Sequence, residues 1–182
     1  AWRLAMLEGH PRHIETLKLV AQKAGWDKPL AAGKQGERRG RGVALHEGFG
    51  SVVAQVAEVT VQRDGQFKVD RVVCSVDCGI AVNPDVIRAQ VEGSVGFALS
   101  ATLREAITLS DGRIDQSNFH NNEPLRIYEM PDVEVHIVPS ANPPTGIGEP
   151  PVAPLAPAVV NALAAATGKR IRRLPISDQL SA

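Results

Sequence analysis

Residues 52–61, VVAQVAEVTV, decide the fold class of this chain. The run alternates and is rich in valine and threonine, which predicts a β-strand within the segment 42–61. Asp64 and Gly65 follow, and an Asp-Gly pair is a strong signal for a tight hairpin turn. The next run, FKVDRVVCSVDCG at 67–79, predicts a second strand. The two strands should therefore pair as an antiparallel hairpin.

Three helices are predicted around this hairpin. Residues 11–25 have apolar side chains near the helical period, with a proline close to the start and a glycine at the end. A second helix is predicted over 84–103, because Asn83 is a good N-cap and a proline follows it. The alanine-rich run 155–167 predicts a third helix, which ends at Gly168.

Further strands are expected after the second helix. DVEVHIVP at 132–139 alternates cleanly, 104–109 precedes the turn signal Ser-Asp-Gly, and IRRLPIS at 171–177 is expected to close the chain as a short strand. The order of elements predicts an α+β fold with an antiparallel or mixed sheet and packed helices.

The domain organisation is predicted from the same pattern. Residues 1–30 form an N-terminal helical segment, 31–41 a polar, glycine-containing linker, and 42–182 the α+β domain.

Composition excludes several classes of function. The 182 residues are 43% hydrophobic and 22% charged, which is typical of a globular chain with a substantial core. Twenty basic and 20 acidic side chains balance, so nothing indicates a nucleic-acid or polybasic membrane partner. No apolar run reaches the roughly 18 residues of a membrane span. Cys74 and Cys78 would lie about 13 Å apart on a strand, too far for a disulfide, so two buried free thiols are expected.

A glycine loop, TGIGEPP at 145–151, is the strongest candidate for chemistry. Gly146 and Gly148 permit positive φ and a close approach of the backbone to another group. The two prolines fix the backbone after Glu149, which would hold this carboxylate just before the amide end of a helix. The alternative is a plain strand-to-helix connection with Glu149 in solvent. Two other acidic residues, Glu58 and Asp77, favour structural roles.

Three separated motifs resemble one enzyme family. They are HEGFGSVVAQVAEVTV at 46–61, VDCGIAVNPDVIRAQVEGSVGFALSA at 76–101, and the segment 145–175. In this order they resemble the C-terminal end of the molybdenum-binding subunit of the xanthine oxidase family of molybdenum hydroxylases, in its isoquinoline 1-oxidoreductase and aldehyde dehydrogenase group. The resemblance implies a molybdenum cofactor-binding type of α+β domain.

The resemblance also implies roles for particular residues. Such enzymes oxidise aldehydes or N-heterocycles by hydroxylation with oxygen from water, and Glu149 matches their general base. Gln90 resembles the glutamine that hydrogen-bonds the pterin part of the cofactor. Gly93, Gly146 and Gly148 would let the backbone approach that cofactor closely. No metal ligand is assigned to this chain.

Partners follow from the same resemblance. It implies a molybdopterin-type molybdenum cofactor, with the cytosine dinucleotide form as one candidate, together with the remainder of the molybdenum subunit and an iron-sulfur small subunit. Subunits of this family are several times longer and carry a Gly-Gly-x-Phe motif that is missing here. We therefore expect the last part of such a subunit, which alone binds no cofactor and has no turnover. The alternative is a noncatalytic domain of the same fold that serves assembly.

Overall fold

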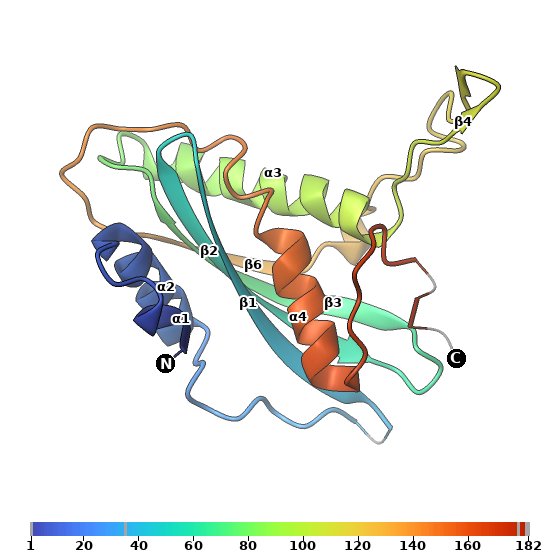
Figure 1. Ribbon diagram of the computed structural model, residues 1–182, viewed down its shortest axis with the longest axis horizontal. Helices are drawn as coiled ribbons and strands as arrows, with labels where there is room; N and C mark the ends of the chain where they lie inside the picture. The colour runs from blue at the N-terminus through green and yellow to red at the C-terminus, as the bar shows by residue number, and fades with distance from the viewer. Residues whose placement is uncertain (1, 35, 178, 181–182) are drawn as a thin grey trace.

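The computed structural model describes residues 2–34, 36–177 and 179–180, and it has the predicted mixture of helices and strands (Figure 1). One four-stranded sheet has the order β1-β2-β3-β6. Its strands are Arg38–Gly48, Ser51–Val61, Phe67–Asp77 and Asp132–Ile137. The first three pair antiparallel and β6 pairs parallel to β3, which confirms the expectation of a mixed sheet.

Helices cover both faces of this sheet. The elements are α1 (Trp2–Ala5), α2 (Pro11–Lys23), α3 (Pro84–Leu103) and α4 (Leu155–Thr167), so the three longer helices confirm the sequence prediction. One hydrophobic cluster joins α2 to one face of the sheet. A larger cluster joins α3 and α4 to the other face. The core therefore has two layers, one on each side of β2 and β3.

Local sequence signals explain most element ends. Asn83 Oδ1 accepts hydrogen bonds from two backbone amides of the first turn of α3, as its N-cap prediction requires. Gly65, at φ 88°, occupies the predicted turn between β2 and β3. A second turn was missed: Phe49 and Gly50 both have positive φ, at 53° and 79°, and divide the segment 42–61 into two strands.

The linker prediction fails at its C-terminal end, because β1 begins at Arg38. Two glycines of that strand lie against the backbone of α4. A Cβ on Gly40 would lie 2.1 Å from the carbonyl oxygen of Ala162, and one on Gly42 would lie 2.2 Å from that of Ala158. Gly40, which the sequence placed in the linker, thus forms with Gly42 the surface on which α4 packs.

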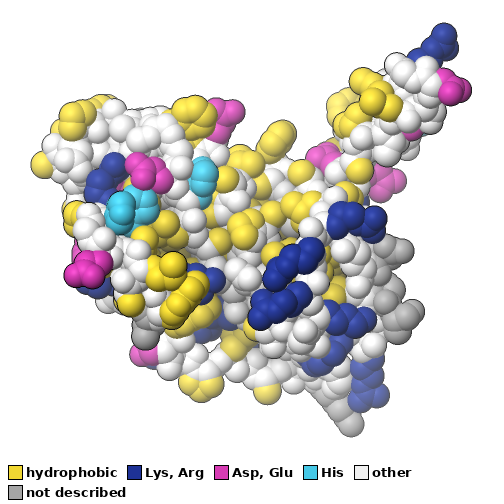
Figure 2. All heavy atoms as spheres, viewed as in Figure 1, with side chains coloured by type: hydrophobic (Ala, Val, Ile, Leu, Met, Phe, Trp, Pro, Cys, Tyr) yellow, Lys and Arg dark blue, Asp and Glu magenta, His cyan; other side chains and the backbone are white. Residues whose placement is uncertain are grey.

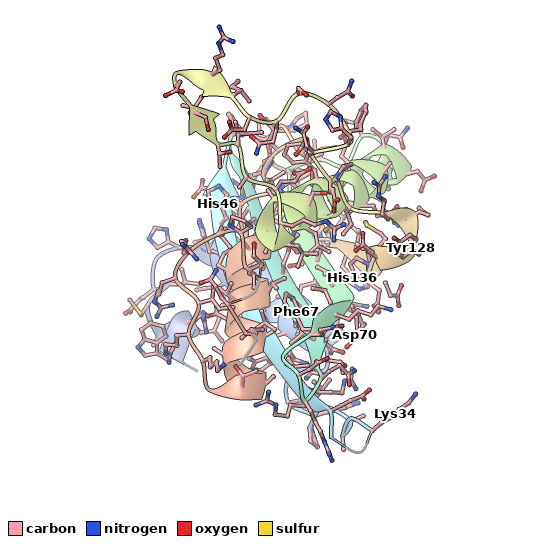
Figure 3. All side chains as sticks on the ribbon, turned by 90° about the vertical axis from the view of Figure 1, so that its right-hand side faces the viewer. Lys34, His46, Phe67, Asp70, Tyr128 and His136 are labelled. Carbon is pink, nitrogen blue, oxygen red and sulfur yellow. The ribbon has the colours of Figure 1, made fainter. Side chains whose placement is uncertain are left out.

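Part of the segment 104–131 forms an arm that extends away from the sheet (Figure 1). The predicted strand 104–109 is wrong: β4 (Leu109–Ser110) pairs only with β5 (Arg113–Ile114). Most of this segment has no sheet edge beside it with which to pair. The 3-10 helix η1 (Ile127–Glu129) follows the arm and lies at the end of α3, where Glu129 pairs with Arg104, and Tyr128 projects from it into solvent (Figure 3).

The predicted strand 171–177 is also wrong. Its backbone amides instead bond to the end of α3: Ile176 N–H donates to Thr102 O and Ser177 N–H to Leu103 O. Helix carbonyls in the last turn lack partners within their own helix. The segment therefore caps α3 and does not extend the sheet.

Candidate cofactor and catalytic site

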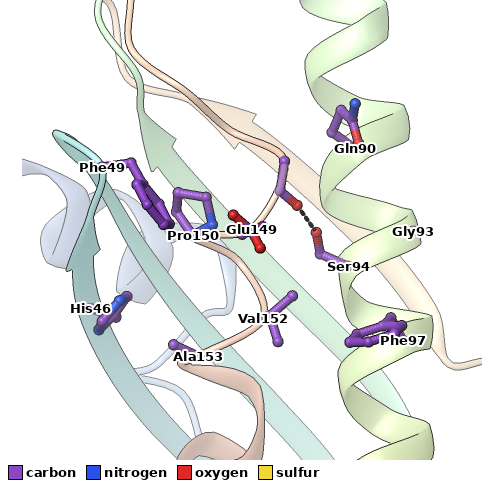
Figure 4. Close-up of a pocket in the computed structure, with 11 residues that line it drawn as sticks. His46, Phe49, Gln90, Gly93, Ser94, Phe97, Glu149, Pro150, Val152 and Ala153 are labelled. Carbon is purple, nitrogen blue, oxygen red and sulfur yellow. Dashed lines mark hydrogen bonds between the residues drawn. The ribbon is translucent and has the colours of Figure 1, made fainter.

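A cavity of about 500 Å³ opens between α3, the glycine loop and the turn between β1 and β2 (Figure 4). These three elements come from distant parts of the chain. The residues that line the cavity are His46, Phe49, Gln90, Gly93, Ser94, Phe97, Gly148, Glu149, Pro150, Val152 and Ala153. The fold thus brings Gln90, Gly93, Gly148 and Glu149 to one site, whereas Gly146 is not part of the lining.

One face of α3 forms a wall of the cavity. Gln90, Gly93, Ser94 and Phe97 follow the i, i+3, i+4, i+7 spacing of a single helical face. Gly93 is exposed, and a Cβ placed there would meet nothing within 4 Å. Gly96 differs, because a Cβ there would lie 3.3 Å from Met130 Sδ. Close packing within the chain therefore explains the glycine at position 96 and not the one at position 93.

The glycine loop is held by side chains from two neighbouring elements. Ser94 Oγ donates to Gly148 O at 2.8 Å, the bond drawn in Figure 4. Gln55 Nε2, fully buried on β2, donates to Pro151 O at 2.8 Å. These bonds fix the backbone on both sides of Glu149.

The Glu149 side chain itself is exposed at the cavity. Within the described part of the chain its carboxylate has no hydrogen-bond or ion-pair partner. It is free to accept a proton or a hydrogen bond from a group that enters the cavity.

Two expectations for the loop are wrong. Neither Gly146 nor Gly148 has positive φ, so the loop needs no left-handed backbone at these positions. Helix α4 does not begin directly after Glu149 either. A turn, in which Val152 N–H donates to Glu149 O at 2.9 Å, precedes the first helical residue, Leu155. Glu149 lies in this turn, and the N-cap position of α4 is Pro154. The Glu149 carboxylate therefore does not cap the helix.

The turn between β1 and β2 supplies lining residues that the sequence prediction missed. His46 lies near the end of β1, Phe49 lies in the turn itself, and Phe49 is 72% exposed at the cavity. A non-glycine residue with positive φ is uncommon in folded proteins. The signal that could have found this turn is the sequence Gly48-Phe49-Gly50 directly before the valine-rich run 52–61.

The structural roles predicted for Glu58 and Asp77 are confirmed. Glu58, 5% exposed, lies 2.8 Å from Arg41 and 3.3 Å from Arg71. Asp77 accepts a 2.8 Å bond from Arg12 Nε and a bond from the Gly79 amide. Although burial acts to raise the pKa of Asp77, these hydrogen bonds outweigh it and hold that pKa below its ordinary value.

The two cysteines are buried and unpaired, as predicted. Burial raises the pKa of both the Cys74 and the Cys78 thiol. They therefore stay protonated and behave as small apolar side chains.

Among the described residues, no helix is both long and apolar enough to pass through a bilayer.

The sequence matches the molybdopterin cofactor-binding domain family over residues 16–131. The chain belongs to this family. It is 33% identical to the beta subunit of isoquinoline 1-oxidoreductase from Brevundimonas diminuta, over 99% of this chain and 23% of that protein. It is 35% identical to a subunit of nicotinate dehydrogenase from Pseudomonas putida, over 93% of this chain and 15% of that protein.

A solved structure shows the same fold. Aldehyde oxidoreductase from Desulfovibrio gigas superposes with a TM-score of 0.61 and 26% identity, over 71% of this chain and 15% of that one. This molybdopterin cofactor-binding domain therefore spans less than a quarter of the relatives that it matches.

The lining of the cavity fits a flat, hydrogen-bonding cofactor in two respects. Gly93 and Gly148 leave the cavity wall without side chains, and a Cβ at either position would meet only open space. The Gln90 amide is exposed and has no hydrogen-bond partner among the described residues. An amide of this kind can both donate to and accept from the edge of a pterin ring.

Proposed function

We propose that this domain forms part of a molybdenum hydroxylase that oxidises aldehydes or N-heterocycles, with Glu149 as its general base. The observation that carries the proposal is the position of Glu149: exposed at the cavity, unpaired within the described chain, and attached to a backbone that is held on both sides. A general base must lie within hydrogen-bond reach of the proton that it removes. A carboxylate already paired within the chain would have to break that pair first.

The other cavity residues would serve the cofactor. Gln90 would hydrogen-bond the pterin, and Gly93 and Gly148 would allow it to approach the backbone, with Gly146 widening the loop beside it. The molybdenum cofactor, for which we propose the cytosine dinucleotide form, would supply the two-electron oxidation of the substrate carbon. Glu149 would take the proton from the water-derived nucleophile. The names of the two sequence relatives, which refer to isoquinoline and nicotinate, support an N-heterocycle as the substrate class.

The proposal includes partners. The remainder of the molybdenum subunit would complete the cofactor site, since the two sequence relatives are several times longer than this chain. An iron-sulfur small subunit would accept the electrons. Alone, the 182 residues would bind no cofactor and have no turnover. Stoichiometric molybdenum in the purified 182-residue chain would contradict this part of the proposal.

The test of the catalytic role is Glu149→Gln in the full-length assembly. Glutamine keeps the shape of the side chain and removes its basicity, so turnover should fall by at least about a thousandfold while molybdenum content stays unchanged. Glu92→Gln is the matched control, because Glu92 is exposed on α3 next to Gly93 but does not line the cavity. If Glu149→Gln kept its activity and changed only assembly or stability, the noncatalytic role would be correct.

A further inference from the structure

Two buried side chains donate hydrogen bonds to the backbone on either side of Glu149. Ser94, 5% exposed on α3, bonds Gly148 O, and Gln55, 0% exposed on β2, bonds Pro151 O. Both bonds are 2.8 Å long. We call Ser94 and Gln55 the loop clamp. It connects the loop to a helix and to a strand at once, so the peptide that carries Glu149 is fixed relative to both.

A third bond holds the loop farther upstream. Ser51 Oγ, also fully buried on β2, donates to Gly146 O at 2.6 Å and lies 2.7 Å from Thr145 Oγ1. The Thr145 amide in turn donates to Cys78 O. The start of the loop is therefore anchored independently of the loop clamp.

The Glu149 carboxylate depends on this backbone for its direction. Its side chain has no hydrogen-bond or ion-pair partner within the described residues, so no contact of its own aims it. The two residues that follow it are prolines, whose rings fix φ and have no N–H that could form an alternative bond. Where the side chain has no support, the orientation of its backbone decides where the carboxylate lies.

Packing alone does not explain Gln55. Its neighbours on the same face of β2, Val53 and Ala57, are apolar and belong to the larger core cluster. Gln55 Oε1 is buried and has no hydrogen-bond partner among the described atoms. Burying such an oxygen costs free energy that an aliphatic side chain would avoid. What the amide contributes in this structure is the bond from Nε2 to Pro151 O.

We infer that Gln55 and Ser94 are positioning residues, which set the distance and angle at which the Glu149 carboxylate meets a reacting group in the cavity. This inference rests on the proposed role of Glu149 as the base. It adds that two residues without a carboxylate, one of them outside the cavity lining, control the efficiency of that base.

The experiment uses Ser94→Ala and Gln55→Met in the full-length assembly. Each removes one donor and leaves a side chain that the buried site can hold. A displacement of about 1 Å can cost about 100-fold in rate. We expect kcat to fall about 10- to 100-fold in each variant, with KM and molybdenum content close to those of the parent. Ser94→Thr keeps the hydroxyl and should recover most of the loss, which loss of packing alone would not allow.

Ser75→Ala is the matched control. Ser75 is fully buried on β3 and donates to Thr16 O at 2.6 Å, on the α2 side of the molecule. Its loss removes a buried hydrogen bond of the same kind without touching the loop. Thermal stability should fall, while kcat should stay within about twofold of the parent.

Amide hydrogen exchange gives a readout that needs no turnover. The Val152 amide donates to Glu149 O, so its protection reports the order of the loop. Its exchange should accelerate about tenfold or more in Ser94→Ala and Gln55→Met, and should be unchanged in Ser75→Ala. Unchanged exchange in both loop-clamp variants would refute the inference.

Glu149→Gln separates the two hypotheses. If this variant stays active, the proposed base is wrong. If it is inactive while Ser94→Ala and Gln55→Met keep kcat within about twofold, the base is correct and the positioning role is wrong. If both are correct, adding Ser94→Ala to Glu149→Gln should lower the residual rate no further, because there is no base left to position.

Discussion

Two sets of glycines show how differently two regions of this molecule are built. At the contact of β1 with α4, a Cβ on Gly40 or Gly42 would overlap the helix backbone at about 2 Å. At the cavity, a Cβ on Gly93 or Gly148 would meet nothing within 4 Å. The first pair is explained by the packing of this chain. Nothing in the described chain explains why the second pair lacks side chains, whereas a group that enters the cavity from outside would explain it.

The carboxylates show the same contrast. Asp77 is buried and paired with Arg12, whereas Glu149 is exposed and has no partner among the described residues. In the body of the domain the buried carboxylate is paired within the chain. At the cavity the carboxylate can bind a group from outside. Figure 2 shows a second open region, the apolar side chains of the arm.

Gly42→Val should have the largest effect. The added side chain would overlap backbone atoms of α4, which cannot move without unpacking the helix. We expect the free energy of unfolding to fall by at least about 3 kcal/mol, measured by urea denaturation. Gly146→Ala, whose Cβ would lie in open space, should change it by less than about 1 kcal/mol. Equal losses of unfolding free energy in both variants would show that the overlap with α4 is not what makes a side chain at position 42 destabilising.

Arg12→Met should be next in size. It leaves Asp77 buried without its guanidinium, which should lower the free energy of unfolding by about 2 kcal/mol at neutral pH, less than for a fully buried pair because Arg12 is partly exposed. The pair lowers the pKa of Asp77, so its contribution is complete above the unfolded pKa of about 3.9 and is lost as pH falls through the lower folded pKa.

The variant reverses this pH dependence at one residue. Burial without the arginine raises the pKa of Asp77 above its unfolded value, so this residue should add stability to the variant as pH falls through the raised pKa, whereas it removes stability from the parent as pH falls. Urea unfolding at a series of pH values from about 3 to about 8 measures both curves. Parallel curves would show that Asp77 is not coupled to Arg12.

Gly93→Ala should have a smaller effect of opposite sign. An alanine in the exposed interior of α3 should raise the free energy of unfolding by about 0.5 to 1 kcal/mol. The same methyl group would occupy the proposed cofactor space, so molybdenum content of the full-length assembly should fall, as metal analysis would show. Gly96→Ala is the control, because its Cβ faces Met130. A stabilised variant with full molybdenum content would show that Gly93 faces solvent only.

Ile127→Ser should have the smallest effect on stability. Ile127 is 91% exposed on η1, so its replacement should change the free energy of unfolding by less than about 0.5 kcal/mol. Differential scanning calorimetry of the full-length assembly measures it. A larger loss would mean that η1 is covered in the assembly.

Much of the fold was predictable because its signals are local. The hairpin of β2 and β3 is encoded by two valine-rich runs around Asp64-Gly65, and α3 by Asn83 and the proline after it. Two predicted strands, 104–109 and 171–177, are wrong. Their composition suits a strand, but neither segment pairs with a strand of the four-stranded sheet. Strand pairing depends on what lies beside a segment, and the sequence of that segment does not contain this information.

The sequence alone determined that this chain carries the motifs of its family and a rigid loop with one carboxylate at Glu149. The tertiary structure decided the rest of the site. It placed the β1–β2 turn beside α3 and packed Gly40, an apparent linker glycine, against α4. It also joined Ser94 and Gln55 to the loop from positions 54 and 96 residues away. Such contacts depend on distances in the folded chain, because any side chain with a hydrogen-bond donor can bond a carbonyl that folding brings within reach.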